Sequence, residues 1–223
     1  LAGMELQMDD WLYPRNQKPL TSEDKVYGNK VYLTIDLNIQ RFAHQASLDI
    51  VEKFGADDGV ITLVADAKTG EILAYVSLPE INLNNYTKID NDDPAKINRP
   101  VAYTYEPGSV FKVFSVCSFL HLPEGIKKES RFFCDGFYRD SNGRPIIKCT
   151  GKHGDIDTGD IIRYSCNTVC YASESVNEES FHYMIKQFGF GDKTGVEVPK
   201  EEPGKIDDFN RWNSRSKPTF SMG

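Results

Sequence analysis

The first half of the chain carries a hydrophobic pattern that predicts a helix. Apolar residues within 37–54 recur every three or four positions, which is the period of an amphipathic helix. Asp36 precedes this run as a predicted N-cap, and Gly55 follows it as a predicted C-terminal stop. The alternating run at 30–36 predicts a short strand that leads into the helix.

A second pattern predicts a β-hairpin. Residues 60–65 and 72–76 are apolar, β-prone runs, and the turn-forming segment 66–70 joins them. Residues 1–29 are polar and irregular, and we interpret them as a connector from an upstream region.

The second half of the chain alternates between helical patterns and loops. A helix is predicted from Ser109 to about Leu122, where Pro123 stops it, and another is predicted over 178–188. Residues 125–160 are rich in loop-forming residues. Together with the hairpin, these helices predict an α+β fold.

Composition and charge narrow the function classes. Of the 223 residues, 39% are hydrophobic and 26% are charged, which is ordinary for a soluble globular domain. The formal net charge of −7 and the dispersed Lys and Arg residues argue against a nucleic-acid partner. No apolar run reaches the roughly 18 residues of a membrane span, so we expect no membrane contact from these residues. Because the chain opens on Leu1 in mid-pattern, we expect it to be an excised piece of a longer protein.

The five cysteines are interpreted as structural. Cys117 lies within an apolar helical run and is expected to be a buried free thiol. Cys134 and Cys149 flank a polar loop and are expected to lie close together, either as a disulfide in an oxidising compartment or as free thiols. A zinc site from Cys134, Cys149 and His153 lacks the paired-ligand spacing of zinc motifs, so we expect no metal ligands.

The strongest chemical signal is a serine and a lysine three residues apart at the start of an apolar helix. Positions i and i+3 share a helix face, so the Lys112 amine can reach the Ser109 hydroxyl. Burial favours the neutral form of a lysine, which can then act as a general base. The Ser109 N–H at the helix start can also donate to an oxyanion. Four apolar neighbours are expected to screen the amine from water: Val110, Phe111, Val113 and Phe114.

Two further Ser-x-x-Lys matches lack this setting. Ser22–Lys25 lies in a polar, turn-like segment, and Ser214–Lys217 ends at a proline without an apolar face. We interpret both as surface polar pairs.

A second motif, Ser-Cys-Asn at 165–167, follows Ser109 in the chain. The Ser165 hydroxyl can relay a proton from the lysine, and the Asn167 amide can orient that lysine and bond a substrate amide. Taken alone, the segment also fits an ordinary turn, and the similar Ser-Val-Asn at 175–177 matches it too. Its position after the Ser-x-x-Lys motif favours the catalytic interpretation.

These motifs, in this order, resemble the transpeptidase domain of class B high-molecular-weight penicillin-binding proteins. The resemblance implies a β-lactamase/transpeptidase-like fold with a helical subdomain and an antiparallel sheet. It divides the chain into a connector at 1–29 and the N-terminal part of a transpeptidase domain at 30–223. It rests on five ordered matches: Leu33-Thr34-Ile35-Asp36, Thr69-Gly70-Glu71-Ile72-Leu73-Ala74, Glu106-Pro107-Gly108-Ser109, Ser165-Cys166-Asn167, and Phe188-Gly189-Phe190-Gly191 with Thr194-Gly195.

The resemblance implies a peptidoglycan D,D-transpeptidase that cross-links stem peptides through a serine acyl-enzyme and is inhibited by β-lactam antibiotics. Ser109 would be the nucleophile, Lys112 its base, and Ser165 and Asn167 the proton-relay and positioning pair that also contacts the substrate. No metal or organic cofactor is implied. The implied partners are stem peptides, β-lactams and other proteins of the cell-wall synthesis complex. The implied location is the extracytoplasmic (periplasmic) face of the bacterial cytoplasmic membrane, with the parent anchored by an N-terminal segment.

The third motif of the family, a Lys-Thr-Gly on a central strand, has no suitable match. The copies at 68–70 and 193–195 are expected to form a hairpin turn and a loop. We therefore expect the true motif to lie beyond Gly223, the sheet to be incomplete within these residues, and the fragment itself to be inactive or impaired. The open sheet edge is then expected to be covered by another chain or by residues outside this segment.

Two other functions fit the motifs less well. A class A β-lactamase needs a deacylating Glu four residues before an Asn, and no such pair follows Asn167. A non-catalytic receptor for β-lactams or stem peptides, or a scaffold in the wall-building complex, stays open until turnover by the full-length parent is measured.

Overall fold

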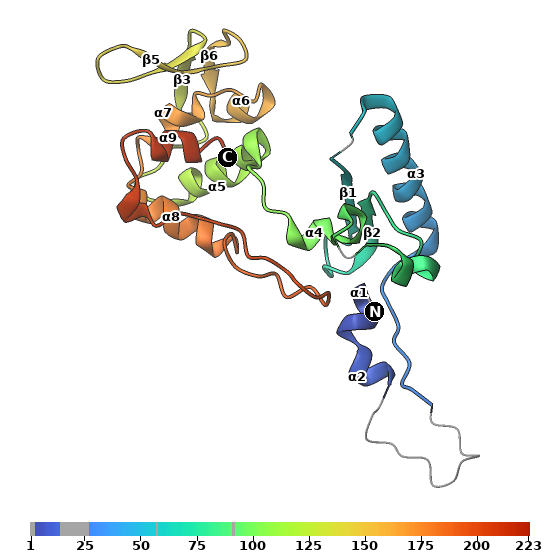
Figure 1. Cartoon of the computed structure of the whole chain (residues 1–223). Coiled ribbons are helices and arrows are strands. Elements are labelled where there is room, and N and C mark those ends of the chain that lie inside the picture. Colours follow the sequence, from blue (N-terminus) through green and yellow to red (C-terminus); the bar gives the residue numbers. More distant parts are fainter. Residues whose placement is uncertain (1–2, 14–26, 57, 91) are drawn as a thin grey trace, which may run out of the picture. The chain divides into compact units, whose positions relative to one another are not determined.

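The structure is a computed structural model that describes residues 3–13, 27–56, 58–90 and 92–223. The chain divides into two compact units, which we describe one at a time (Figure 1). The first unit comprises Leu1–Tyr103 with Gly195–Glu202, and the second comprises Thr104–Thr194 with Pro203–Gly223.

The predicted amphipathic helix of the first unit is confirmed as α3 (Leu37–Phe54). The Asp36 carboxylate caps its start by accepting the N–H groups of Asn38 and Ile39 at 2.8 and 3.0 Å. Gly55 ends it in a left-handed conformation, with φ of 61°. Both ends of the helix are therefore set by local signals that the sequence displays.

The predicted hairpin is confirmed as β1 (Val60–Ala65) and β2 (Ile72–Leu78), which pair antiparallel and pack against α3. The Asp66 carboxylate accepts two N–H groups of the connecting turn, so the Lys-Thr-Gly at 68–70 is part of this turn, as predicted. The small core between helix and hairpin consists of Ala43, Ala74, Val76 and Leu78.

The strand predicted at 30–36 is wrong, because these residues form no regular element. Asp36 donates one backbone N–H to the Leu73 carbonyl, and the Thr34 hydroxyl donates to the Ile72 carbonyl. Two bonds hold the segment beside β2 without building a strand ladder.

The remaining elements of the first unit are short. Part of the predicted connector at 1–29 is helical, and residues 14–26 of it lie outside the described residues. The described elements are α1 (Gly3–Gln7), α2 (Asp9–Leu12), the 3-10 turns η1 (Leu83–Lys88) and η2 (Pro94–Lys96), and α4 (Arg99–Ala102).

The second unit is built around α5 (Lys112–His121), which the 3-10 turn η3 (Gly108–Phe111) precedes. Helix α5 packs against α7 (Val169–Ser173) and α8 (Glu178–Gln187). The Phe119 and Phe181 rings, both 0% exposed, lie 4.8 Å apart between α5 and α8. The predicted helices are confirmed here, except that Ser109 lies on the 3-10 turn before the α-helix. The other helical elements are α6 (Thr158–Arg163), η4 (Phe209–Arg211) and α9 (Ser216–Phe220).

The region predicted to be loop-rich at 125–160 also contains four short strands. β3 (Arg131–Cys134) pairs with β6 (Gly154–Asp157), and β4 (Phe137–Arg139) pairs with β5 (Pro145–Lys148), both antiparallel. Each strand has only three or four residues, which is too short for an alternating pattern to predict.

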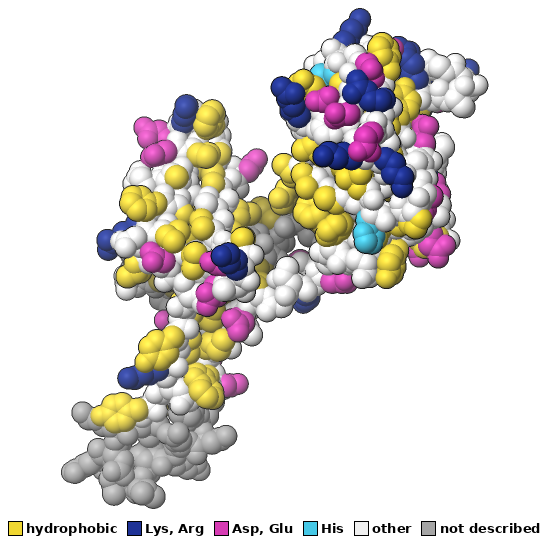
Figure 2. Space-filling model, turned by 180° about the vertical axis from the view of Figure 1, so that it is seen from behind, with side chains coloured by type: hydrophobic (Ala, Val, Ile, Leu, Met, Phe, Trp, Pro, Cys, Tyr) yellow, Lys and Arg dark blue, Asp and Glu magenta, His cyan; other side chains and the backbone are white. Residues whose placement is uncertain are grey.

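Within the described residues, each of the three sheets has two strands. The Lys-Thr-Gly at 193–195 lies on no strand, as predicted. No helix in this part of the chain has both the length and the apolarity that crossing a bilayer requires. On the face shown in Figure 2, basic and acidic side chains are interspersed.

Candidate active site

Lys112 is a buried lysine at the first position of α5. The residue is only 1% exposed, and its amine is surrounded by oxygen acceptors. The amine donates to the Ser165 carbonyl at 2.7 Å and lies 3.3 Å from the Ser165 hydroxyl. It also donates to Asn167 Oδ1 at 2.6 Å. The structure thus brings together three of the four residues predicted to form the site.

The electrostatic setting of Lys112 favours loss of its proton. Burial lowers the pKa of the amine below its ordinary value, because the ammonium form loses its hydration. Negative charge at Cys149, Cys166 or Cys170 acts in the opposite direction and raises that pKa. Because the three bonded acceptors are uncharged oxygens, the burial effect prevails.

Lys217, the lysine of the third Ser-x-x-Lys match, has a different environment. Its amine donates to the Val176 carbonyl at 2.6 Å and lies 3.6 Å from a Glu178 carboxylate oxygen. These two contacts join α9 to the start of α8 and the segment before it, so this lysine serves packing. The other match, Ser22–Lys25, lies outside the described residues.

Ser109 lies on the exposed side of η3, one turn before the buried amine. Gly108 precedes it with φ of +62°, a left-handed conformation that glycine adopts without strain. The Gly223 backbone packs against the same turn, so closely that a Cβ there would clash with the Gly108 carbonyl oxygen.

Only part of the predicted apolar screen is confirmed. Phe111 is 4% exposed, and its ring makes edge-to-face contacts with Phe190 and Phe220. Val110 and Val113 are instead 69% and 48% exposed, because they lie on the helix face opposite the core.

Ser165 has a backbone conformation that non-glycine residues rarely adopt, with φ of 50°. It follows α6, and its N–H donates to the Ile162 carbonyl. The next residue, Cys166, donates its N–H to the Ile161 carbonyl at 2.8 Å. This left-handed turn ends α6 and places both oxygens of Ser165 beside the Lys112 amine.

Asn167 connects the lysine to the end of β5. Its Nδ2 donates to the Lys148 carbonyl at 2.9 Å, so its Oδ1 faces the Lys112 amine. Its backbone N–H donates to Cys149 Sγ at 3.3 Å. The asparagine side chain is therefore fixed at both ends, and it orients the lysine.

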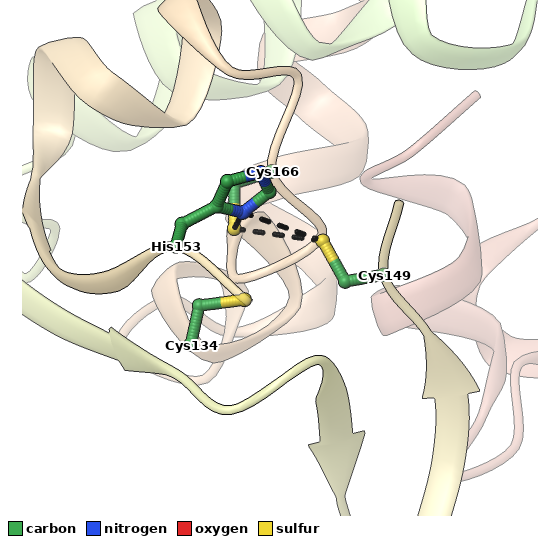
Figure 3. Close-up of side chains that lie close together, drawn as sticks. All are labelled: Cys134, Cys149, His153 and Cys166. Carbon is green, nitrogen blue, oxygen red and sulfur yellow. Dashed lines mark hydrogen bonds between the residues drawn. The ribbon is translucent and has the colours of Figure 1, made fainter. Parts of the chain in front are cut away.

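The prediction of no metal ligands missed a cluster beside this turn. Cys134, Cys149, His153 and Cys166 place one ligand atom each within 4.8 Å of one another (Figure 3). The predicted proximity of Cys134 and Cys149 is confirmed, and both are free thiols. The sequence prediction concerned Cys134, Cys149 and His153, which lack paired-ligand spacing. It left out the fourth member, Cys166, which belongs to the Ser-x-Asn motif. Cys117 is exposed, contrary to its predicted burial, because it points away from the core face of α5.

Residues 60–223 match the family model described as the penicillin binding protein transpeptidase domain. The chain belongs to this family. Its fold agrees: the apo structure of the TP domain from Burkholderia pseudomallei penicillin-binding protein 3 superposes with a TM-score of 0.71 at 25% identity. The match covers 86% of this chain and 52% of that one.

Two curated relatives of this transpeptidase-family chain have names that state a function or process. The peptidoglycan D,D-transpeptidase MrdA of Acinetobacter baumannii is 32% identical over 218 residues, covering 91% of this chain and 31% of MrdA. Stage V sporulation protein D of Bacillus subtilis is 30% identical over 199 residues, covering 88% of this chain and 30% of that protein. The chain thus spans about a third of the length of these relatives.

Proposed function

We propose that the protein containing this chain is a peptidoglycan D,D-transpeptidase that forms an acyl-enzyme on Ser109. The observation that carries the proposal is the Lys112 amine, which is buried and bonded to uncharged oxygens of Ser165 and Asn167. The exposed Ser109 lies three residues earlier, on the 3-10 turn that precedes α5. A neutral amine in that position has the chemistry of a general base.

In the acylation step, Lys112 takes the proton of the Ser109 hydroxyl as its oxygen attacks the carbonyl carbon of the penultimate D-Ala. The backbone N–H of Ser109 donates to the oxyanion that forms. The peptide bond then breaks, and the terminal D-Ala leaves as an amine after it receives a proton. The products are free D-Ala and an ester between the shortened stem peptide and Ser109.

Ser165 and Asn167 serve this step in different ways. The Ser165 hydroxyl is 3.3 Å from the lysine amine and relays the proton to the leaving amine. The Asn167 side-chain carbonyl oxygen holds the amine in place. Its Nδ2 group donates one N–H to the Lys148 carbonyl, and its second N–H is the donor for the amide of a stem peptide.

Deacylation runs the same steps in reverse with a different amine. The amine of a neighbouring stem peptide attacks the ester carbonyl, and Lys112 accepts its proton through Ser165. The Ser109 oxygen leaves with a proton from the lysine, which completes the cross-link. A β-lactam, whose ring amide replaces the D-Ala-D-Ala bond, acylates the same oxygen.

The remaining features of the proposal concern the parent protein. Residues 30–223 form the N-terminal part of its transpeptidase domain, and 1–29 connect it to an upstream region. Its substrates lie on the extracytoplasmic side of the membrane, where it works with other proteins of wall synthesis. The lysine-bearing third motif and the second oxyanion donor come from another part of the parent.

Turnover on a lipid-linked peptidoglycan substrate tests this proposal against the receptor or scaffold alternative. The full-length parent is expected to form cross-linked dimers and release D-Ala, and its Ser109→Ala variant is expected to do neither. Ser214→Ala is the matched control and is expected to keep full activity. A parent that binds penicillin but releases no D-Ala would favour the receptor.

A further inference from the structure

We propose that a pocket at the C-terminal half of α8 binds the carboxylate group of a peptide ligand. The pocket has a volume of about 330 Å³ and lies within the second unit. Two lysines, a histidine, an aspartate, an isoleucine and two glycines line it, and none of these belongs to the residues proposed for the transpeptidase reaction. Pockets of this size take small molecules or the end of a longer ligand.

Basic side chains reach the pocket from two elements. His182 and Lys186 lie four positions apart on α8, so they share one face of that helix. Lys205 comes from the loop before η4. Asp208 is the one acidic residue of the lining, so with histidine counted as neutral the two lysines leave an excess of one positive charge. The lining therefore suits a ligand group with a single negative charge.

The Lys186 amine is held at the pocket by an ion pair that a ligand can share. Its Nζ lies 2.9 Å from Asp192 Oδ1. A Cβ at Gly191 would lie 3.1 Å from the same Nζ, so the amine lies close over the glycine backbone. The Asp192 side chain is 61% exposed, and exposed ion pairs contribute little stability. An ammonium has three donors, which leaves donors for a second acceptor.

The loop opposite α8 offers donors that the protein itself does not use. Lys205 is exposed, and within the described part of the chain its amine has neither an ion pair nor a hydrogen bond. In the same part of the chain, the backbone N–H groups of Gly191, Gly204 and Lys205 donate to no other protein group. A carboxylate in the pocket would give these donors a charged acceptor, and such hydrogen bonds are stronger than neutral ones.

Two glycines keep the pocket open. Gly191 has φ of +82°, a conformation in which a side chain is strained. A Cβ at Gly191 would also lie 3.4 Å from Ile206 Cδ1, so it would occupy space between the Lys186 amine and the loop. Gly204 packs on Gly191, because a Cβ at Gly204 would lie 3.4 Å from the Gly191 nitrogen. Backbone rather than side chain thus lines this part of the pocket.

The negative charge of Asp208 favours a carboxylate over a phosphate. Asp208 Oδ1 accepts the backbone N–H and the side-chain Nδ2 of Asn210 at 2.9 and 2.8 Å. These bonds hold the pKa of the Asp208 carboxyl below its ordinary value, so the group stays charged. A doubly charged phosphate would be repelled more strongly than a carboxylate. Ile206 and the His182 ring, which packs against Phe209, provide apolar surface for the residue that bears the carboxylate.

Saturation-transfer NMR on the full-length protein tests this proposal with three probes. These are N-acetyl-L-alanyl-L-alanine, its uncharged C-terminal amide, and inorganic phosphate as a competitor. The acid is expected to bind about tenfold more tightly than the amide, because only the acid has a charged acceptor. Phosphate is expected to displace the acid only at concentrations above the Kd of the acid. Equal binding of acid and amide, or no binding of either, overturns the proposal. Displacement by phosphate below that Kd would overturn the carboxylate assignment.

Charge variants locate the binding at this pocket. Lys205→Glu is expected to weaken binding of the acid about tenfold or more. The matched control is Lys193→Glu, which makes the same charge change at an exposed lysine outside the lining and should bind as the native protein does. Asp208→Asn keeps the acceptor for Asn210 but removes the negative charge, so it should tighten binding about threefold or more. Equal binding by the two lysine variants, or weaker binding by Asp208→Asn, contradicts the proposal.

Binding after treatment with penicillin separates this pocket from the reaction site. The pocket contains neither Ser109 nor Lys112, so the acid should bind the penicillin-treated protein and the Ser109→Ala variant with the native Kd. The proposal therefore does not rest on the proposed function and survives its failure. Loss of binding after penicillin treatment would place the probe at the reaction site and overturn the pocket.

Discussion

The two units bury their apolar side chains to very different extents. In the second unit, Phe119 and Phe181 are both 0% exposed. In the first, Ile61 and Leu63 on β1 are 40% and 49% exposed, and Phe42 on α3 is 77% exposed. Figure 2 shows hydrophobic side chains on the surface of both units. The second unit thus has large aromatic rings in its core, whereas the core of the first unit consists of four aliphatic side chains and leaves β1 half exposed.

This difference shows which part of the chain can support the proposed chemistry. A lysine loses its proton readily only where water is excluded, and the second unit provides that exclusion around Lys112. The two-stranded hairpin of the first unit excludes little water. The Lys-Thr-Gly at 68–70 lies on that hairpin, where it forms an exposed turn.

Replacing the buried lysine is expected to have the largest effect. Lys112→Arg should reduce acylation by a labelled penicillin by about 10²- to 10⁴-fold, because a guanidinium stays protonated and cannot act as a base. Lys68→Arg in the first unit is the matched control and should acylate normally. Stopped-flow acylation of the full-length parent measures both, with melting temperatures to confirm folding. Acylation by Lys112→Arg at the control rate would contradict the role of the lysine.

Core substitutions in the two units should differ in their effect on stability. Phe181→Ala removes a fully buried ring and should lower the free energy of unfolding by about 3–5 kcal/mol. Leu63→Ala removes a side chain that is 49% exposed and should cost about 1 kcal/mol or less. Urea denaturation followed by fluorescence provides the comparison. Equal losses in the free energy of unfolding would mean that Leu63 is as fully buried in solution as Phe181.

The two Ser-x-Asn matches allow a similar comparison within the second unit. Asn167→Ala removes an acceptor from the Lys112 amine and should slow acylation about 10- to 100-fold. Asn177→Ala removes the N-cap of α8 and should lower stability by about 1 kcal/mol without slowing acylation. If both variants slow acylation equally, Asn167 has no special role in acylation, and the segment at 165–167 is an ordinary turn like that at 175–177.

The pH dependence of acylation should report the titration of Lys112. Burial lowers the pKa of this amine, so its neutral form becomes populated at a lower pH than that of an exposed lysine. The acylation rate should therefore rise with pH and level off below the ordinary lysine value of 10.5. Negative charge on Cys149, Cys166 or Cys170 would shift this midpoint upward. A midpoint at or above the ordinary value would contradict a neutral lysine base.

The smallest effect is expected at the cap of the first unit's helix. Asp36→Ala leaves the Asn38 and Ile39 N–H groups without their acceptor and should destabilise α3 by about 1 kcal/mol. Circular dichroism during thermal unfolding measures the loss, and acylation by Ser109 should not change. A loss of stability as large as that expected for Phe181→Ala would mean that Asp36 stabilises the first unit by more than capping α3.

The elements that could be predicted are those whose start, hydrophobic period and end are all encoded in one continuous stretch of the sequence. Helix α3 has its cap, its period and its terminal glycine in one continuous stretch, so its bounds followed directly. The prediction of a strand at 30–36 was wrong because an alternating pattern does not by itself provide a neighbouring strand to pair with. Strands β3 to β6 are too short to show any period.

The candidate site was predictable where neighbouring residues form the motif. Lys112 and Asn167 were identified from two short segments, although their 2.6 Å contact is a tertiary feature. The left-handed backbone of Ser165 carries no sequence signal, because glycine or asparagine is the usual residue there. The cysteine–histidine cluster was missed because its ligands come from four elements, so their spacing in the sequence has no regular form.

Peptide mapping of the penicillin adduct tests the central claim most directly. The full-length parent, treated with a labelled penicillin and digested, should carry the added mass on the peptide containing Ser109, and Ser109→Ala should carry none. An adduct on Ser22 or Ser214, or labelling that persists in Ser109→Ala, would contradict the assignment of Ser109 as the nucleophile.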